Sequence, residues 1–121
     1  MALIVIDKSG FVRDWGPYVG DAEPCFCAVT RMEILYSARS ETDYAERAED
    51  LDAFGDLRMD AATFVAAESA QRDLARTGEQ RVAISDLWIG VCAQQHGADV
   101  LHRDKHFDLL AGIFGFRSIR V

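Results

Sequence analysis

Ala2-Leu3-Ile4-Val5-Ile6-Asp7, residues 2–7, is a short apolar run with three consecutive β-branched residues and an acid at its end. Such a run predicts a β-strand that is buried on both faces, as the strands of parallel sheets are. In open α/β folds, ligands bind outside the carboxyl ends of these strands. The stretch therefore predicts an α/β fold in which Asp7 lies at a functional edge.

Outward from this strand, strand-like and helix-like segments alternate along the chain. Further strands are expected at residues 24–29, 57–59, 99–102 and 117–121. One helix is expected to begin after a Ser9 cap and to stop at Gly16 and Pro17, and another is expected to begin at residue 30. Further helices are expected at 42–54, at 61–77 after an Asp60 cap, between a Ser85 cap and Gly97, and at 105–111. This alternation implies a mainly parallel central sheet of about five strands, flanked by helices on both faces. The length of 121 residues predicts one domain, residues 1–121.

The composition describes an acidic globular protein. Half of the residues are hydrophobic, 27% are charged, and the net charge is −7. This charge argues against non-specific nucleic-acid binding, and it suits carboxylates gathered around a cation. No apolar run is long enough for a membrane span or has the flanks of a signal peptide, so a cytoplasmic location is expected. The three cysteines, an odd number without framework spacing, are expected to be buried thiols.

Four acids that are far apart in the sequence are expected to meet at one edge of the sheet. Asp7 and Asp104 each follow a predicted strand, and Glu33 and Asp86 lie near the starts of two predicted helices. Clustered carboxylates repel one another unless a cation neutralises them. A site made of oxygen ligands favours Mg²⁺ or Mn²⁺, ions that can assist displacement at phosphorus.

Each of these acids also has a purely structural interpretation, which is weakest for Asp7, because an acid at the end of a buried parallel strand is rarely just solvated. Glu33 could complete a capping box with Thr30, Asp86 could complement the dipole of its helix, and Asp104 could cap the helix that follows it. One residue can both cap a helix and bind a metal, so the two interpretations remain open together.

The local sequence around each acid resembles a motif of the PIN-domain ribonucleases, the toxins of VapBC toxin–antitoxin pairs. The four stretches are Val5-Ile6-Asp7-Lys8-Ser9, residues 30–39, residues 82–90 and residues 96–107. They occur in the order of the family's motifs and cover most of the chain. Each motif is weak alone, but four in order are specific.

The resemblance implies a PIN-like fold and a metal-dependent endoribonuclease that hydrolyses RNA with a metal-activated water. Asp7, Glu33, Asp86 and Asp104 match the quartet that binds Mg²⁺ or Mn²⁺, and Ser9 matches a hydroxyl residue that supports the first acid. The sequence departs from the family at three positions. Lys8 and His102 stand where threonine is common, and His106 stands where many members have another acid.

The resemblance also implies partners. RNA is the substrate, and a VapB-type antitoxin is expected to insert a basic segment into the acidic groove. A homodimer is expected, with the helices of residues 30–54 contributing to its interface. Candidate RNA contacts, chosen by their sequence proximity to the acids, are Arg13, Arg31, Arg39, Arg81, Arg103 and His106.

Two alternatives come from other functional classes. A Mg²⁺-binding phosphoacceptor receiver domain would be similar in size and acidity, but it needs an acid pair after the first strand and an Asp after the third. Asp7 stands alone, and Asp56 precedes the weak third strand. A catalytically silent PIN-like binding module is the other alternative, and the presence of all four acids argues against it.

Overall fold

The computed structural model describes residues 2–79 and 81–121. Its five strands form one sheet in the order β3-β2-β1-β4-β5, in which every pairing is parallel. The strands are β1 Leu3–Ile6, β2 Glu23–Cys27, β3 Gly55–Leu57, β4 Ala98–His102 and β5 Ser118–Arg120. The predicted parallel α/β fold is thus confirmed, with the opening apolar run as its central strand.

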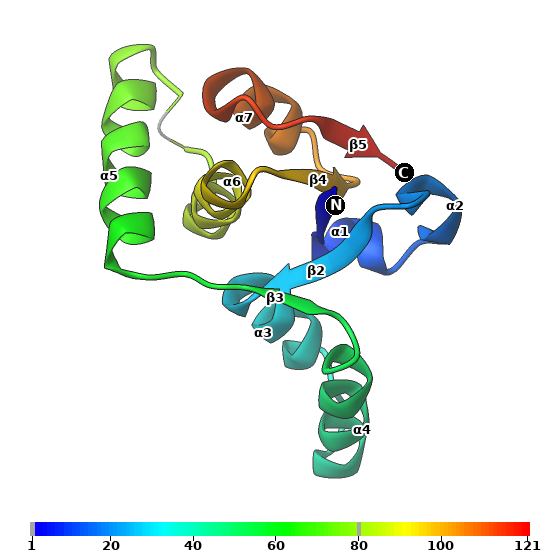
Figure 1. Cartoon of the computed structure of the whole chain (residues 1–121). Coiled ribbons are helices and arrows are strands. Elements are labelled where there is room, and N and C mark those ends of the chain that lie inside the picture. The colour runs from blue at the N-terminus through cyan, green and yellow to red at the C-terminus, as the bar shows by residue number, and fades with distance from the viewer. Residues whose placement is uncertain (1, 80) are drawn as a thin grey trace.

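Helices cover both faces of the sheet (Figure 1). The helices are α1 Lys8–Phe11, α2 Gly16–Val19, α3 Ala28–Tyr36, α4 Glu41–Leu51, α5 Ala61–Arg76, α6 Ile84–His96 and α7 His106–Phe114. One face packs against α5, α6 and α7, and the other packs against α1 to α4. Among the described helices, none is both long and apolar enough to cross a membrane.

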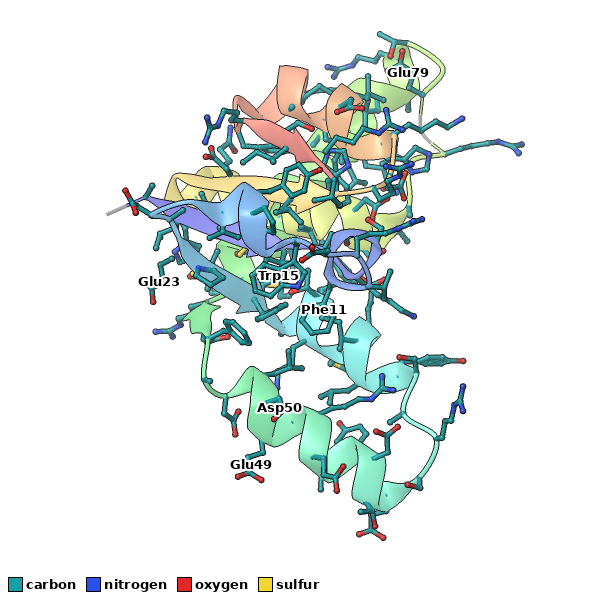
Figure 2. The ribbon with its side chains drawn as sticks, turned by 90° about the vertical axis from the view of Figure 1, so that its right-hand side faces the viewer. Phe11, Trp15, Glu23, Glu49, Asp50 and Glu79 are labelled. Atoms are coloured by element: carbon teal, nitrogen blue, oxygen red, sulfur yellow. The ribbon has the colours of Figure 1, made fainter. Side chains whose placement is uncertain are left out.

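The central strand is apolar at every position because alternate side chains enter two different cores. Val5 packs with residues of α5, α6 and α7, whereas Ile4 and Ile6 pack with residues of α3 and α4. Phe11 and Trp15 extend the second core on the side of the sheet that faces α4, as Figure 2 shows. Cys25, Cys27 and Cys92 are buried free thiols, as predicted.

Several predicted boundaries are wrong by a few residues. Asp7 caps α1 by accepting a hydrogen bond from the Ser9 amide, so Ser9 is not the cap. Gly16 and Pro17 begin α2 rather than only ending α1, because the fixed φ of proline suits the first turn of a helix. β2 ends at Cys27, which caps α3, so Val29 is helical and Thr30 lies in the first turn.

Among the other helix ends, some differ from the prediction and others agree with it. Ala83, not Ser85, precedes α6, and α4 ends at Leu51, three residues earlier than predicted. The Asp60 cap of α5 is confirmed, because its carboxylate accepts from the Thr63 amide at 3.3 Å. Gly97 ends α6 in the left-handed conformation, with φ 63°, that glycine adopts without strain.

Candidate active site

Asp7 leaves the carboxyl end of β1 at the centre of the sheet. Its amide donates to the Leu101 carbonyl at 3.0 Å, which ties it to the neighbouring strand β4. Its carboxylate is buried and accepts hydrogen bonds from the amide and the hydroxyl of Ser9. The Ser9 hydroxyl also accepts from the Arg103 amide at 2.9 Å. Ser9 therefore joins the first acid to the loop that carries Asp104.

Glu33 lies in the second turn of α3, because that helix begins at Ala28. It is not part of a capping box. The Thr30 hydroxyl accepts from the Cys27 amide at 3.0 Å, so Cys27 and Thr30 form the box. Among the described residues, Oε1 of Glu33 is buried without a hydrogen-bond partner. Burial, followed by the charges of Asp7 and Asp86, raises the pKa of Glu33.

Asp86 lies in the first turn of α6, as predicted, and its side chain is 10% exposed. Burial is the main cause that raises its pKa to about 6, and the charges of Asp7 and Asp104 act in the same direction. A contact of 3.2 Å with Nδ1 of His106 opposes these effects. The raised pKa thus reflects first the burial of the Asp86 carboxyl and then the neighbouring negative charges of Asp7 and Asp104.

Asp104 follows β4 and accepts a hydrogen bond from the His106 amide at 3.0 Å at the start of α7. The cap position of that helix is Lys105 rather than Asp104, so Asp104 contacts the helix start from one residue further upstream. Ligand atoms of Asp86, Asp104 and His106 all lie within 4.8 Å of one another. The structure thus brings Asp86 and Asp104 together with His106, and electrostatic effects on pKa link Asp86 to Asp7 and Glu33. The metal-binding role of the quartet stays a prediction.

His102 supports this cluster from inside the fold, a role that the sequence reasoning missed. Its side chain is fully buried, its Nδ1 accepts from the Asp104 amide at 3.0 Å, and its Nε2 bonds to the Ser118 hydroxyl. That hydroxyl donates to Asp108 at 2.7 Å. Burial lowers the pKa of His102, which suits the neutral ring that these bonds require. A histidine between an apolar strand and a site acid was the available signal.

Replacing His102 with Leu is expected to lower the free energy of unfolding by about 2 kcal/mol, because the half-buried Asp104 amide and Ser118 hydroxyl each lose a hydrogen-bond partner. Urea denaturation would measure the change. His96→Gln is the matched control, since His96 lies at the far end of α6, where it bonds the Arg58 carbonyl. A loss below about 0.5 kcal/mol for His102→Leu, within the range of ordinary surface substitutions, would contradict this role.

The candidate RNA-binding arginines are not equally placed. Arg31 points toward α4, where it pairs with Asp52 at 2.9 Å and bonds the Ala48 carbonyl, so the structure does not bring it to the acids. Arg103 donates to the Val121 backbone oxygen. Arg13, Arg39 and Arg81 are exposed. Sequence proximity misjudged Arg31 because a helix turns successive side chains by 100°.

Lys8 is a second basic residue, besides His106, that the structure places beside the acids. Its charge lowers the pKa of Glu33, and both residues line an open pocket of about 450 Å³. The other residues of this pocket are Val29, Met32, Tyr36 and Trp88. The acid cluster is thus bordered by an apolar pocket with a lysine at its edge.

The sequence model of the PIN domain matches residues 6–113, which include all four acids. The chain belongs to the PIN domain family. This match confirms the resemblance that the four motifs indicated. It also removes the receiver-domain alternative, in agreement with Asp56, which lies within β3 rather than after it.

Individual PIN-domain relatives cover most of the chain. It is 40% identical to Ribonuclease VapC18 of Mycobacterium tuberculosis over 106 residues, which cover 85% of this chain and 77% of the relative. It is 35% identical to Ribonuclease VapC17 of the same species over 122 residues, covering 92% and 89%.

Solved structures confirm the PIN-like fold. A member of the VapBC toxin–antitoxin family from M. tuberculosis, VapBC-5, superposes with a TM-score of 0.75 at 26% identity and covers 100% of both chains. DNA-bound VapBC from Salmonella typhimurium has a TM-score of 0.77 at 19% identity, covering 99% of this chain and 98% of that one.

Proposed function

We propose that this PIN domain is a metal-dependent endoribonuclease that acts as the toxin of a type II toxin–antitoxin pair. The observation that supports it most is the gathering of carboxylates at the carboxyl edge of a parallel sheet, where Oε1 of Glu33 is buried without a hydrogen-bond partner in the part of the chain that the structure describes. The names of the relatives, which are VapC ribonucleases, point to RNA as the substrate. We also propose that residues 1–121 act as a single domain.

The residues present fit a divalent cation. Asp7, Glu33, Asp86 and Asp104 supply hard oxygen donors, the kind that Mg²⁺ and Mn²⁺ prefer. The raised pKa values of Glu33 and Asp86 arise from burial and from neighbouring negative charge, both of which a cation would offset. When bound, such an ion activates water and stabilises charge at phosphorus.

The protein's own groups then have distinct tasks. Ser9 holds the Asp7 carboxylate through two hydrogen bonds, and His102 holds the backbone at Asp104. Glu33 has a raised pKa and a buried oxygen that no other described residue bonds, which suits a carboxylate that takes the proton of the attacking water. Lys8, at the edge of the cluster, suits contact with the scissile phosphate.

The experiment that tests this function compares RNA cleavage by the purified protein in Mg²⁺ or Mn²⁺ with cleavage in EDTA. Cleavage is expected to stop in EDTA and to return when excess Mg²⁺ or Mn²⁺ is added. The measurement is a gel assay of total cellular RNA. Cleavage that survives EDTA would contradict the metal-dependent mechanism, and folded protein without cleavage under any condition would favour the silent binding module.

The net negative charge does not preclude RNA binding, because much of it is concentrated on α4. That helix carries five acids and a single arginine. Figure 1 shows α4 projecting beyond α3, and Figure 2 shows Glu49 and Asp50 on it, below the sheet. Basic side chains near the site can therefore bind RNA locally. We propose that these side chains are Lys8, Arg13, Arg39, Arg81 and Arg103, with His106 beside them.

Replacing Arg13, Arg39 and Arg81 with Ala together is expected to weaken binding of single-stranded RNA and to flatten its dependence on salt. Each lost phosphate contact should reduce the slope of log K against log salt by about 0.7. Fluorescence anisotropy at several salt concentrations would measure this slope. Arg76→Ala is the control, because that residue pairs with Asp73 on the exposed side of α5. Equal slopes in wild type and triple variant would remove these arginines from the RNA-binding surface.

The proposed antitoxin partner suits the pocket beside the acids. Its apolar lining of Val29, Met32, Tyr36 and Trp88 can take an apolar segment, and the neighbouring carboxylates can take an arginine. The exposed apolar side chains of α3 and α5, such as Met32, Tyr36 and Phe64, suit a homodimer contact. The acidic α4, also within the predicted residues 30–54, is less suited to pack against its own copy.

A further inference from the structure

One imidazole reaches into the acid cluster. Nδ1 of His106 lies 3.2 Å from Oδ2 of Asp86 and 3.8 Å from Oδ1 of Asp104. With these two carboxylates it forms a group whose ligand atoms lie within 4.8 Å of one another. Ligand atoms bound to one ion at about 2.2 Å lie roughly 3 to 4.4 Å apart. The three side chains therefore already have nearly the spacing of a shared coordination shell.

We propose that His106 binds the same divalent cation as Asp86 and Asp104, which makes the site a mixed nitrogen–oxygen site that favours Mn²⁺ over Mg²⁺. This inference rests on the metal-dependent function proposed above and specifies which ion that function prefers. Imidazole is a good ligand for transition metals, whereas Mg²⁺ strongly prefers oxygen.

The backbone fixes His106 where this role requires it. Its amide donates to Oδ1 of Asp104 at 3.0 Å, and the next residue, Phe107, is fully buried against the core. The imidazole is thus held at the first residue of α7, and its side chain remains 35% exposed. A ligand placed by an anchored helix start is preorganised, which favours binding.

The contact between His106 and Asp86 is also explained by this role. In the absence of an ion, two groups that both offer lone pairs can approach to 3.2 Å only by sharing a proton. A divalent cation can replace that proton between the same two atoms. A histidine that served only to contact RNA would have no need to lie beside both the buried Asp86 and the half-buried Asp104.

The test uses the full chain and Mn²⁺ alone. Pulsed electron paramagnetic resonance of bound Mn²⁺ detects the nitrogen of a directly coordinated imidazole. A nitrogen signal is expected in the wild type and in the control His96→Gln, whose histidine lies at the far end of α6. The signal should vanish in His106→Asp, which offers an oxygen ligand in place of nitrogen.

Calorimetric titration of Mn²⁺ and Mg²⁺ gives an independent readout. His106→Asp is expected to lower the ratio of Mn²⁺ to Mg²⁺ affinity by at least about tenfold, because even second-shell changes alter metal affinity by 10- to 100-fold. Bound Mn²⁺ without a nitrogen signal, or an unchanged signal and ratio in His106→Asp, would overturn the role of His106 while leaving the metal-dependent nuclease intact. Failure of the wild type to bind either ion would overturn both proposals.

Discussion

Replacing Asp7 with Asn is expected to lower RNA cleavage by at least about a thousandfold while the protein stays folded. The carboxylate leaves the central strand, is buried, and affects the pKa of both Glu33 and Asp86. Asn keeps the shape and can still accept from Ser9, but it removes the negative charge that a cation requires. A metal contributes several kcal/mol of transition-state stabilisation, and about 4 kcal/mol corresponds to a factor of a thousand in rate.

Single-turnover cleavage of a labelled RNA would measure this loss, and circular dichroism would verify the fold. Asp50→Asn is the matched control, because it removes the same charge from an exposed position on α4. The control should cleave at the wild-type rate. Asp7→Asn activity within tenfold of wild type would place the catalytic metal elsewhere.

The fold could be predicted because its signals are local. A continuous apolar strand such as residues 3–6 indicates burial on both faces, and the alternation of strands with helices leaves a parallel sheet as the natural arrangement. The helix starts were harder, because several polar residues compete to cap a helix. After β1, Asp7 and Ser9 were both candidate caps for α1, and the Asp7 carboxylate is the group that accepts the hydrogen bond from the backbone amide.

The sequence predicted that the four acids lie near one another, but not how their side chains are connected, and their role as a site stays a prediction. Strand ends identified Asp7 and Asp104 as neighbours, since parallel strands end at the same edge. Sequence could not show that Thr30 bonds Cys27 rather than Glu33, because that depends on where α3 begins. Nor could it show that His106 turns toward Asp86, because the two residues are far apart in the chain and meet only through packing of α7 on α6.

Replacing Asp86 with Asn is expected to raise the melting temperature of the metal-free protein by about 5 °C at pH 7.5. Folding raises the pKa of Asp86 from 3.8 to about 6, so at this pH the fold holds a charged group that it disfavours. Because the folded state binds more protons than the unfolded state between these two pKa values, its stability falls as the pH rises through about 6. Asn is neutral throughout and can still accept from His106.

The gain from Asp86→Asn should therefore shrink as the pH is lowered below about 6, to roughly half at pH 5, and should be nearly absent only at about pH 3.5, where the wild-type carboxyl is protonated in the folded and in the unfolded state. Calorimetry of both proteins in EDTA at each pH would measure the difference. Comparing the two proteins removes the opposite effect of His102, whose lowered pKa makes the fold less stable in acid. A difference that did not vary with pH would contradict the raised pKa of Asp86.

Saturating Mn²⁺ should reverse the order of the two proteins at pH 7.5. An ion at a hundred times its dissociation constant stabilises the folded state by about 2.7 kcal/mol, and the wild type would gain this in full. The variant lacks a ligand and should gain less. Buried like charges that weaken the metal-free fold are the same groups that would bind the cation, so instability without metal and affinity for metal have one physical origin. A variant that stayed more stable than wild type in saturating Mn²⁺ would show that Asp86 does not bind the ion.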